Sequence, residues 1–498
     1  MEPIQYAYLC IYLLALFSLF IYGINCYVLL VFYRLNYPKA IKTHAEIKET
    51  FYRDVSAENW PRVTIQLPIY NELYVVERLI DAVCRIDYPK DLLEVQVLDD
   101  STDDTVGIAK AMVAKMKARG FDIVYIHRTS RIGFKAGALK EGLKSAKGEF
   151  IGIFDADFVP NTDFLKESIP YFVDPNIGML QTRWGHLNYD YSMLTRAQSM
   201  GIDGHFAIEQ ASRAWSGLFM NFNGTAGVWR KKTIEDAGGW QADTLTEDLD
   251  LSYRAQLKGW KLAFAPQVVC PAEVPVTINA FKSQQHRWAK GSIQTAKKNL
   301  GELFKSDVSM FVKIQAFLHL THYMVHPMML LVVLTSIPML YTGWFFESLA
   351  YPIMIFTLFC LATCGPSSLY LFSQRILYRD WKSRIKYLPF LMCLGTGIAV
   401  NNTKAVLEAF LGMESGFIRT PKYGIKSKED QWKGKRYSIP LNSVSIIEFI
   451  LGLYSLTGFF MFLFFSKYLI SPFLFIYTAG FFYVFFLSVK HGYKKTEQ

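Results

Sequence analysis

Long apolar stretches near both ends of the chain enclose one long polar region. Residues 7–33, 314–346, 348–374 and 468–489 contain no Asp, Glu, Lys or Arg, and residues 449–466 form a shorter stretch of the same kind. About 20 apolar residues span the hydrocarbon core of a bilayer. The pattern therefore predicts five transmembrane helices, one in an N-terminal anchor at residues 1–35 and about four in a C-terminal region at residues 301–498.

The first apolar stretch predicts a retained anchor. It is longer than the core of a signal peptide and lacks a small-residue cleavage pattern. Residues 387–403 are apolar but short, and Lys404 and Glu408 follow them. We expect an interfacial helix there, although the sequence leaves open whether residues 387–411 cross the membrane.

The polar region predicts an α/β domain at residues 61–300, which a connector at residues 36–60 joins to the anchor. Runs rich in β-branched residues alternate with helical patterns, and such alternation is typical of a largely parallel sheet. The predicted strands are Val63–Pro68, Leu93–Leu98, Asp122–Ile126 and Phe150–Phe154. A helix is expected between the second and third strands, where Val106, Ala109, Val113 and Met116 recur at helical spacing.

Charge predicts which side of the membrane carries the domain. The chain has a net charge of +10, and the segment 375–440 holds thirteen Lys and Arg against five Asp and Glu. Under the positive-inside rule, this segment and the basic C-terminus are cytoplasmic. With five crossings the α/β domain is then cytoplasmic too, at a bacterial plasma membrane or a Golgi membrane. The basic surplus comes without a nucleic-acid-binding module, so nucleic acid is not an expected partner.

Acidic pairs follow two of the predicted strands. Asp99 and Asp100 end the second strand, and Asp155 and Asp157 end the fourth. Ligands of parallel sheets bind at the carboxyl ends of the strands, so these side chains are expected to share one crevice. Two carboxylates at i and i+2 can hold a hard divalent cation, although a loop cap is the commoner role of an isolated pair. Asp99 and Asp100 could equally cap the next helix.

Three further motifs admit a structural and a functional interpretation. Lys135 lies among small residues, where it is either a solvated surface lysine or a phosphate ligand. Thr246-Glu247-Asp248 starts a probable helix, where its carboxylates either balance the helix dipole or act as a base. Gln284-x-x-Arg287-Trp288 precedes the membrane region, as an interfacial belt or as a clamp for phosphate and sugar.

In this order, the motifs resemble those of the processive, membrane-integrated family 2 glycosyltransferases. The resemblance covers Pro61 to about Leu300, and the segments Gln66–Glu72, Phe222–Arg230 and Ser283–Trp288 are most similar to cellulose synthase-like mannan synthases. It implies a GT-A-type α/β domain combined with an all-α transmembrane bundle. Phe417–Lys422 resembles the gating loop of cellulose synthase, with Arg419 in place of a valine.

The resemblance also implies roles for individual residues. Asp248 would be the general base, with Glu247 beside it, and Asp155 and Asp157 would hold Mg²⁺ or Mn²⁺. The nucleotide sugar would contact Asp99, Asp100, Lys135, Asp155, Gln284 and Arg287. The acceptor would contact Trp288, Asn223, Gly224 and Thr225.

The function implied is inverting transfer of a hexose from UDP-glucose or GDP-mannose to a growing β-linked polysaccharide, with translocation of the product. The alternative enzyme transfers one sugar to a lipid acceptor by the same chemistry. A third hypothesis, a transporter or scaffold with an inactive domain, predicts broken acidic motifs, and none is broken. The sequence identifies neither the donor sugar nor the linkage, nor any protein partner.

Overall fold

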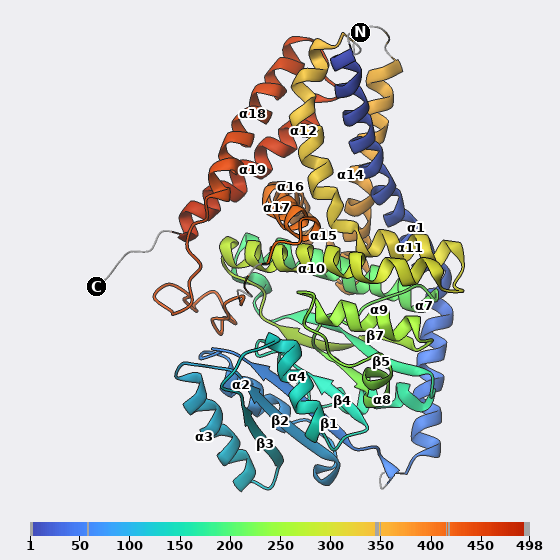
Figure 1. Ribbon diagram of the computed structural model, residues 1–498, viewed down its shortest axis with the longest axis vertical. Coiled ribbons are helices and arrows are strands. Elements are labelled where there is room, and N and C mark those ends of the chain that lie inside the picture. Colours follow the sequence, from blue (N-terminus) through green and yellow to red (C-terminus); the bar gives the residue numbers. More distant parts are fainter. Residues whose placement is uncertain are drawn as a thin grey trace.

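The computed structural model describes residues 3–56, 59–343, 348, 350–414, 416 and 419–492. An α/β domain forms one end of the molecule and a bundle of long helices the other, with further helices lying across the boundary between them (Figure 1). Lys494 and Lys495, which contribute to the predicted basic C-terminus, lie outside the described residues.

A seven-stranded mixed sheet forms the centre of the α/β domain, in the order β3-β2-β1-β4-β6-β5-β7. The first four strands pair in parallel, so the predicted parallel sheet is confirmed for this half. The other half differs, because β6 is antiparallel to both of its neighbours. The strands are β1 (Val63–Ile69), β2 (Leu93–Asp99), β3 (Asp122–His127), β4 (Phe150–Ile153), β5 (Ile177–His186), β6 (Gly227–Arg230) and β7 (Lys261–Ala272).

Helices cover both faces of this sheet, and the central strands β1, β2 and β4 are almost wholly buried. The predicted helix after β2 is α3. It begins at Thr105, whose backbone amide donates a hydrogen bond to the Asp103 side chain at 3.0 Å. It ends just before Gly120, whose φ of +82° suits a residue without a side chain. The domain helices are α2 (Val76–Cys84), α3 (Thr105–Ala118), α4 (Phe134–Ser145), α5 (Phe164–Ser168), α6 (Met193–Gly204), α7 (Ala211–Trp215), α8 (Lys231–Asp236) and α9 (Glu247–Leu257).

Five of the described helices are long and apolar enough to cross a membrane, in agreement with the sequence pattern. They are α1 (Pro3–Asp54), α14 (Ala350–Leu377), α18 (Val444–Phe464), α19 (Ser471–Gly492) and the stretch His322–Tyr341, which is a short 3₁₀ turn followed by α12 (Val325–Tyr341). Helix α1 continues unbroken to Asp54, through most of the predicted connector, and Ala40 and Phe51 on its polar half are buried.

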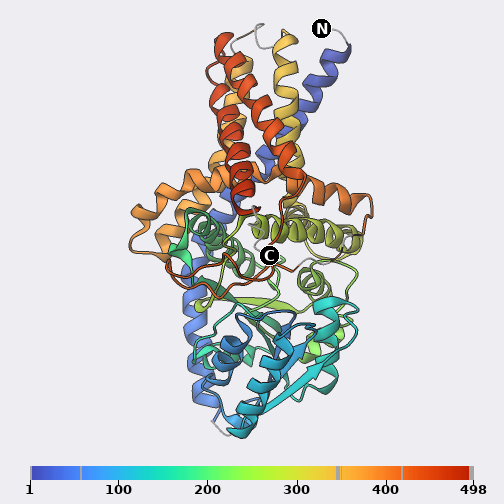
Figure 2. The ribbon, with the colours of Figure 1, turned by 90° about the vertical axis from the view of Figure 1, so that its left-hand side faces the viewer.

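Several helices lie between the bundle and the sheet (Figure 2). The helical stretch Trp381–Gly397, which includes α15 and α16, meets helix α17 at a bend of 41°. Together they form either a broken sixth span or the predicted interfacial element. The longest helix of this layer is α10, which follows β7 and carries the Gln284–Trp288 motif. These helices are α10 (Ile278–Lys305), α11 (Met310–Leu320), α15 (Trp381–Arg384), α16 (Leu388–Gly397) and α17 (Ala399–Phe410).

Buried charges fix α10 against one helix of the bundle and one helix of its own layer. Lys282 lies 2.6 Å from Glu448 of α18, and Lys290 lies 3.1 Å from Glu408 of α17. Removing one member of a buried pair leaves an uncompensated charge, so these contacts hold α10 in one orientation. The helix therefore presents its Gln284–Trp288 motif to the sheet from a fixed position.

Candidate active site

A cavity of about 180 Å³ lies at the strand ends of the sheet, under α10. It is lined both by residues that follow strands and by residues from α9, α10 and the loop before β6. Eleven of the predicted site residues line it: Asp100, Lys135, Asp155, Asp157, Asn223, Gly224, Glu247, Asp248, Gln284, Arg287 and Trp288. We call Asp100, Lys135, Asp155 and Asp157 the strand-end half of the cavity and Glu247, Asp248 and Trp288 the helix half, and Asn223, Gly224, Gln284 and Arg287 lie between them.

In the strand-end half, the carboxylates face cations of the same chain. Lys135, in the first turn of α4, donates to Asp155 at 2.5 Å and to the Gly224 carbonyl at 2.9 Å. Burial alone would lower the pKa of Lys135, but Asp155 and Glu247 raise it above its ordinary value. Arg128 contacts both oxygens of Asp100, at 2.8 and 2.5 Å. The strand ends therefore present fixed charge pairs to the cavity.

The segment after α17 supplies two more cations to this half. Lys422 forms an ion pair with Asp157, and Arg419 lies 2.6 Å from Glu72. Both cations line the cavity and reduce the space beside the carboxylates. The segment belongs to the predicted gating-loop resemblance, of which Phe417 and Ile418 lie outside the described residues.

The strand-end half has part of what a divalent cation needs. Among the described residues, Asp157 Oδ1 is buried without a hydrogen-bond partner, and Asp155 lines the same cavity. No group of three or more His, Cys, Asp and Glu side chains in the described ranges could hold a metal by itself. Mg²⁺ is commonly bound through one or two carboxylates plus substrate phosphates, so two carboxylates fit an ion that arrives with a diphosphate.

In the helix half, Glu247 and Asp248 occupy the first turn of α9. Burial and the neighbouring charge of Glu247 raise the pKa of Asp248 to about 7, and burial raises the pKa of Glu247. A carboxylate with a pKa near the working pH is suited to accept a proton. The start of α9 lies close to α10, because Gly291 has no side chain: a Cβ there would be 2.5 Å from Thr246.

The loop before β6 lies between the two halves. Gly224 has a φ of +83°, and a Cβ there would be 2.8 Å from Asp248 Oδ2. Its carbonyl accepts the hydrogen bond from Lys135, so this one residue touches both halves. Only a residue without a side chain fits between the lysine and Asp248.

The Gln284–Trp288 motif lies on one face of α10, because positions i, i+3 and i+4 of a helix are neighbours. All three side-chain positions line the cavity, and Arg287 donates to Thr420 at 3.3 Å. Trp288 also packs against a hydrophobic cluster that includes Tyr323 and Val406, next to the membrane bundle. The cavity therefore reaches the helices of the boundary layer.

Two predicted residues do not line the cavity. Asp99 is fully buried, and its carboxylate accepts hydrogen bonds from Tyr125 at 2.6 Å and from the Ser101 amide at 2.8 Å. Thr225 accepts from the Asp155 amide at 2.8 Å. Thr225 therefore holds Asp155, which lines the cavity, whereas Asp99 binds two groups that do not line it.

The structure adds lining residues that the motifs did not include as candidates. Arg131 stacks over Tyr70 at 3.3 Å, and Glu273 accepts from the amides of Tyr423 and Gly424 at 3.0 and 2.9 Å. Glu72, Arg131, His186 and Glu273 all line the cavity. Glu72 ends a segment on which the resemblance depended, whereas the other three have no sequence signal, since only the tertiary fold brings them to the strand ends.

Comparisons with known proteins agree with this arrangement. Residues 61–291 match the family model described as "Glycosyltransferase like family 2". The chain is 34% identical over 445 residues to the probable glucomannan 4-beta-mannosyltransferase 10 of Arabidopsis thaliana, covering 86% of this chain and 78% of the relative. It is 42% identical over 265 residues to the glucomannan 4-beta-mannosyltransferase 2 of the same plant, covering 52% of this chain and 50% of the relative.

The chain thus spans about half the length of the second of these relatives. Among solved structures, a mannosyltransferase from Pyrobaculum calidifontis in complex with GDP-Man and Mn²⁺ is 21% identical, with a TM-score of 0.46 over 78% of this chain and 99% of that one. The seven-stranded mixed sheet and the family model together confirm the predicted GT-A-type fold.

Proposed function

The chain belongs to the family 2 glycosyltransferases, as its cellulose synthase-like relatives show, and on this basis we propose that it is an inverting membrane hexosyltransferase that extends a β-linked polysaccharide. The donor is a nucleoside diphosphate sugar. We infer that mannose is the transferred sugar, because the relatives are named for β-mannosyl transfer.

One observation carries the proposal: a base and a set of diphosphate ligands line one cavity that reaches the boundary layer of the bundle. Asp248, with its pKa raised to about 7, lies in the helix half. Lys135 and Asp155 lie in the strand-end half, and Trp288 joins the cavity to a cluster beside the membrane helices. A donor bound between the halves would place its leaving diphosphate in the strand-end half, and the acceptor would approach its sugar from the helix half.

In the proposed reaction, Asp248 removes the proton of an acceptor hydroxyl, which attacks the anomeric carbon in line as the nucleoside diphosphate departs. Lys135 donates hydrogen bonds to the departing diphosphate, where charge develops. Trp288 stacks on the terminal sugar of the acceptor and orients it. Attack from the face opposite the leaving group converts an α-linked donor into a β-linked product.

Asp155 and Asp157 would hold Mg²⁺ or Mn²⁺, which would offset the charge of the diphosphate when bound. Lys422 already contacts Asp157, so this lysine must move when the ion and the donor enter. Glu72 binds Arg419, and Glu273 accepts hydrogen bonds from the amides of Tyr423 and Gly424. These contacts would hold the chain on both sides of Lys422 while the lysine moves.

We further propose that the α/β domain is cytoplasmic and that the product crosses the membrane through the bundle. The apolar helices and the basic segment 375–440 support this orientation. A polymer that leaves beside Trp288 meets α17 of the boundary layer and Tyr323, at the start of the membrane-length stretch His322–Tyr341.

The test is a donor screen on the purified full-length protein in detergent, with GDP-mannose, UDP-glucose and their alternatives, each with Mg²⁺ or Mn²⁺. Released nucleotide, product linkage and product size are measured together. The proposal predicts a β-linked polymer of mannose. A product that extracts into chloroform without any polymer would instead identify a lipid glycosyltransferase, and no transfer from any donor would contradict enzymatic activity.

A further inference from the structure

The loop that holds Gly224 is supported by a partly buried polar cluster, of which only Asn223 lines the cavity. We define the His205 cluster as His205, Glu209, Gln210, Arg213, Asn221 and Asn223. Its first three members lie in a π-helical turn, η5 (His205–Gln210), between α6 and α7. Single π-helical turns inside α-helices are frequent at functional sites.

Hydrogen bonds in the cluster fix the orientation of the Asn223 amide. Gln210 Nε2 donates to the Asn221 carbonyl at 2.8 Å, so its amide can have only one orientation. The same nitrogen donates to Asn223 Oδ1 at 2.6 Å, which leaves Asn223 Nδ2 facing His205 Nε2 at 2.9 Å. An amide nitrogen only donates, so Nε2 of His205 must accept and carries no proton.

The proton of His205 is therefore on Nδ1, which donates to Glu209 Oε2 at 2.9 Å. Arg213, itself buried, contacts the other oxygen of Glu209 at 3.1 Å. Burial opposes ionisation of Glu209, but the hydrogen bond from His205 and the guanidinium of Arg213 outweigh it and hold the pKa of Glu209 well below its ordinary value. Glu209 is thus a fixed acceptor that selects one tautomer of the imidazole.

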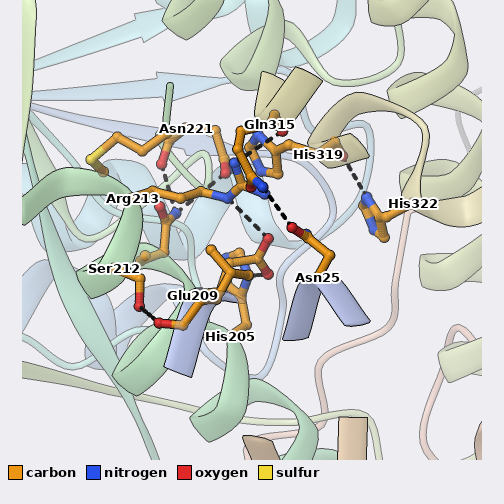
Figure 3. Close-up of polar contacts among 12 residues, drawn as sticks. Asn25, His205, Glu209, Ser212, Arg213, Asn221, Gln315, His319 and His322 are labelled. Carbon is orange, nitrogen blue, oxygen red and sulfur yellow. Dashed lines mark hydrogen bonds and ion pairs between the residues drawn. The ribbon is translucent and has the colours of Figure 1, made fainter. Parts of the chain in front are cut away.

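The cluster is anchored to the boundary helices (Figure 3). Arg213 lies at its centre and also donates to the Gln315 carbonyl on α11 at 3.3 Å. The Gln315 side chain donates to Asn25 of α1 at 2.8 Å. The imidazole that contacts Asn223 is therefore held by groups that cannot rearrange independently.

On the cavity side, the position of the loop decides two distances of the proposed reaction. Gly224 follows Asn223, its carbonyl holds Lys135, and its α-carbon lies against Asp248. Movement of the loop would shift the lysine away from Asp155 or close the space beside Asp248. Misplacement by about 1 Å can cost a factor of 10² in rate.

We propose that His205, oriented by Glu209, is a positioning residue that holds the Asn223–Gly224 loop between Lys135 and Asp248. The role deepens the proposed function and rests on it. His205 does not line the cavity, so it acts through Asn223 rather than on the sugar.

The test uses amide replacements that keep one contact each, in the full-length protein with the donor that supports wild-type transfer. In His205→Gln the side-chain oxygen reaches the place of Nε2 and accepts from Asn223. In His205→Asn the shorter amide reaches only the place of Nδ1, facing Glu209. His205→Ala removes both contacts. Ser212→Ala is the matched control, because it removes a buried 2.7 Å hydrogen bond from α7 to Leu29 without touching Asn223.

We expect kcat to fall roughly 10- to 100-fold in His205→Ala and His205→Asn, and His205→Gln to recover most of the loss. The affinity for the nucleoside diphosphate, measured by calorimetry, should change less than about threefold in all of them. Ser212→Ala should leave kcat within about twofold of wild type. The double variant His205→Ala/Asn223→Ala should be no slower than Asn223→Ala alone, since both changes remove the same hydrogen bond between His205 and Asn223.

Equal activity of the Gln and Asn variants would overturn the inference, as would losses that multiply in the double variant. A His205→Ala protein that fails to fold leaves the decision to the Gln and Asn pair. A wild-type protein without transfer from any donor contradicts the proposed function, whereas an active wild type with unaffected His205 variants contradicts only the positioning role.

Discussion

The two halves of the cavity balance their carboxylates in different ways. In the strand-end half, each carboxylate faces a cation: Asp100 faces Arg128, Asp155 faces Lys135 and Asp157 faces Lys422. In the helix half, Glu247 and Asp248 form no ion pair with a described residue. The charge of Lys135 opposes the shift at both carboxylates, but burial outweighs it and raises the pKa of both. Paired charges suit the binding of a charged leaving group, and an unpaired buried carboxylate suits the removal of a proton.

The largest effect that separates the halves is expected from Asp248→Asn. The amide keeps the shape of the side chain but cannot accept a proton, so kcat should fall by roughly 10²- to 10⁴-fold. Binding of the nucleoside diphosphate, followed by calorimetry, should stay within about threefold of wild type, because that ligand belongs to the other half. Asp243→Asn, which changes an exposed carboxylate shortly before α9, is the matched control. Unchanged turnover would remove Asp248 as the base.

Lys135→Met should damage the strand-end half instead. Methionine keeps the length and loses the charge, so kcat/KM for the donor should fall roughly 10- to 100-fold, together with affinity for the nucleoside diphosphate. Lys144→Met, at an exposed position on the same helix α4, should change neither quantity. A normal diphosphate affinity in Lys135→Met would contradict the division of the cavity into two halves.

The pH dependence of kcat should report the helix half alone. Asp248 accepts a proton only when ionised, and its pKa is raised to about 7, so kcat should fall about tenfold from pH 8 to pH 6. The residual rate of Asp248→Asn should lack this decline. A rate that is flat over this range in the wild type would mean that Asp248 does not titrate during turnover.

Trp288→Ala should have the smallest effect. Loss of stacking on the acceptor sugar should lower kcat/KM for an added oligosaccharide roughly two- to tenfold and shorten the polymer, with donor KM unchanged. Product length is read by size-exclusion chromatography. Trp381→Ala, which lies in α15 outside the cavity, serves as the control. A change in donor KM alone would mean that the indole contacts the donor, and it would contradict the assignment of Trp288 to the acceptor.

The sequence predicted the parallel strands β1 to β4 better than the rest of the α/β domain. Strands β1 to β4 were predicted to within about one residue, because each is a run rich in β-branched residues next to a helical pattern. The acidic pairs that end β2 and β4 fall where parallel strands place their ligands. Asp99 shows the limit of this reasoning, since its neighbour Asp100 reaches the cavity while its own side chain is buried.

The rest of the α/β domain and its cavity depend on contacts that no local sequence pattern encodes. Strand β6 has four residues and runs antiparallel, so nothing in its sequence distinguishes it from a loop. The π-helical turn at His205 has no sequence signature, and its role is visible only once Asn223 is placed against it. Lys422 reaches Asp157 from 265 positions away in the chain, through the packing of α10 and α17.

The central claim is that diphosphate and acceptor bind to opposite halves of one cavity. The most direct test is a structure of Asp248→Asn with an intact nucleotide sugar, Mn²⁺ and a manno-oligosaccharide. The account predicts the diphosphate at Lys135, Asp155 and Asp157, and an acceptor hydroxyl within about 3.2 Å of residue 248, in line with the leaving group. A diphosphate bound at Glu247, or an acceptor terminus that approaches from the strand-end half, would contradict it.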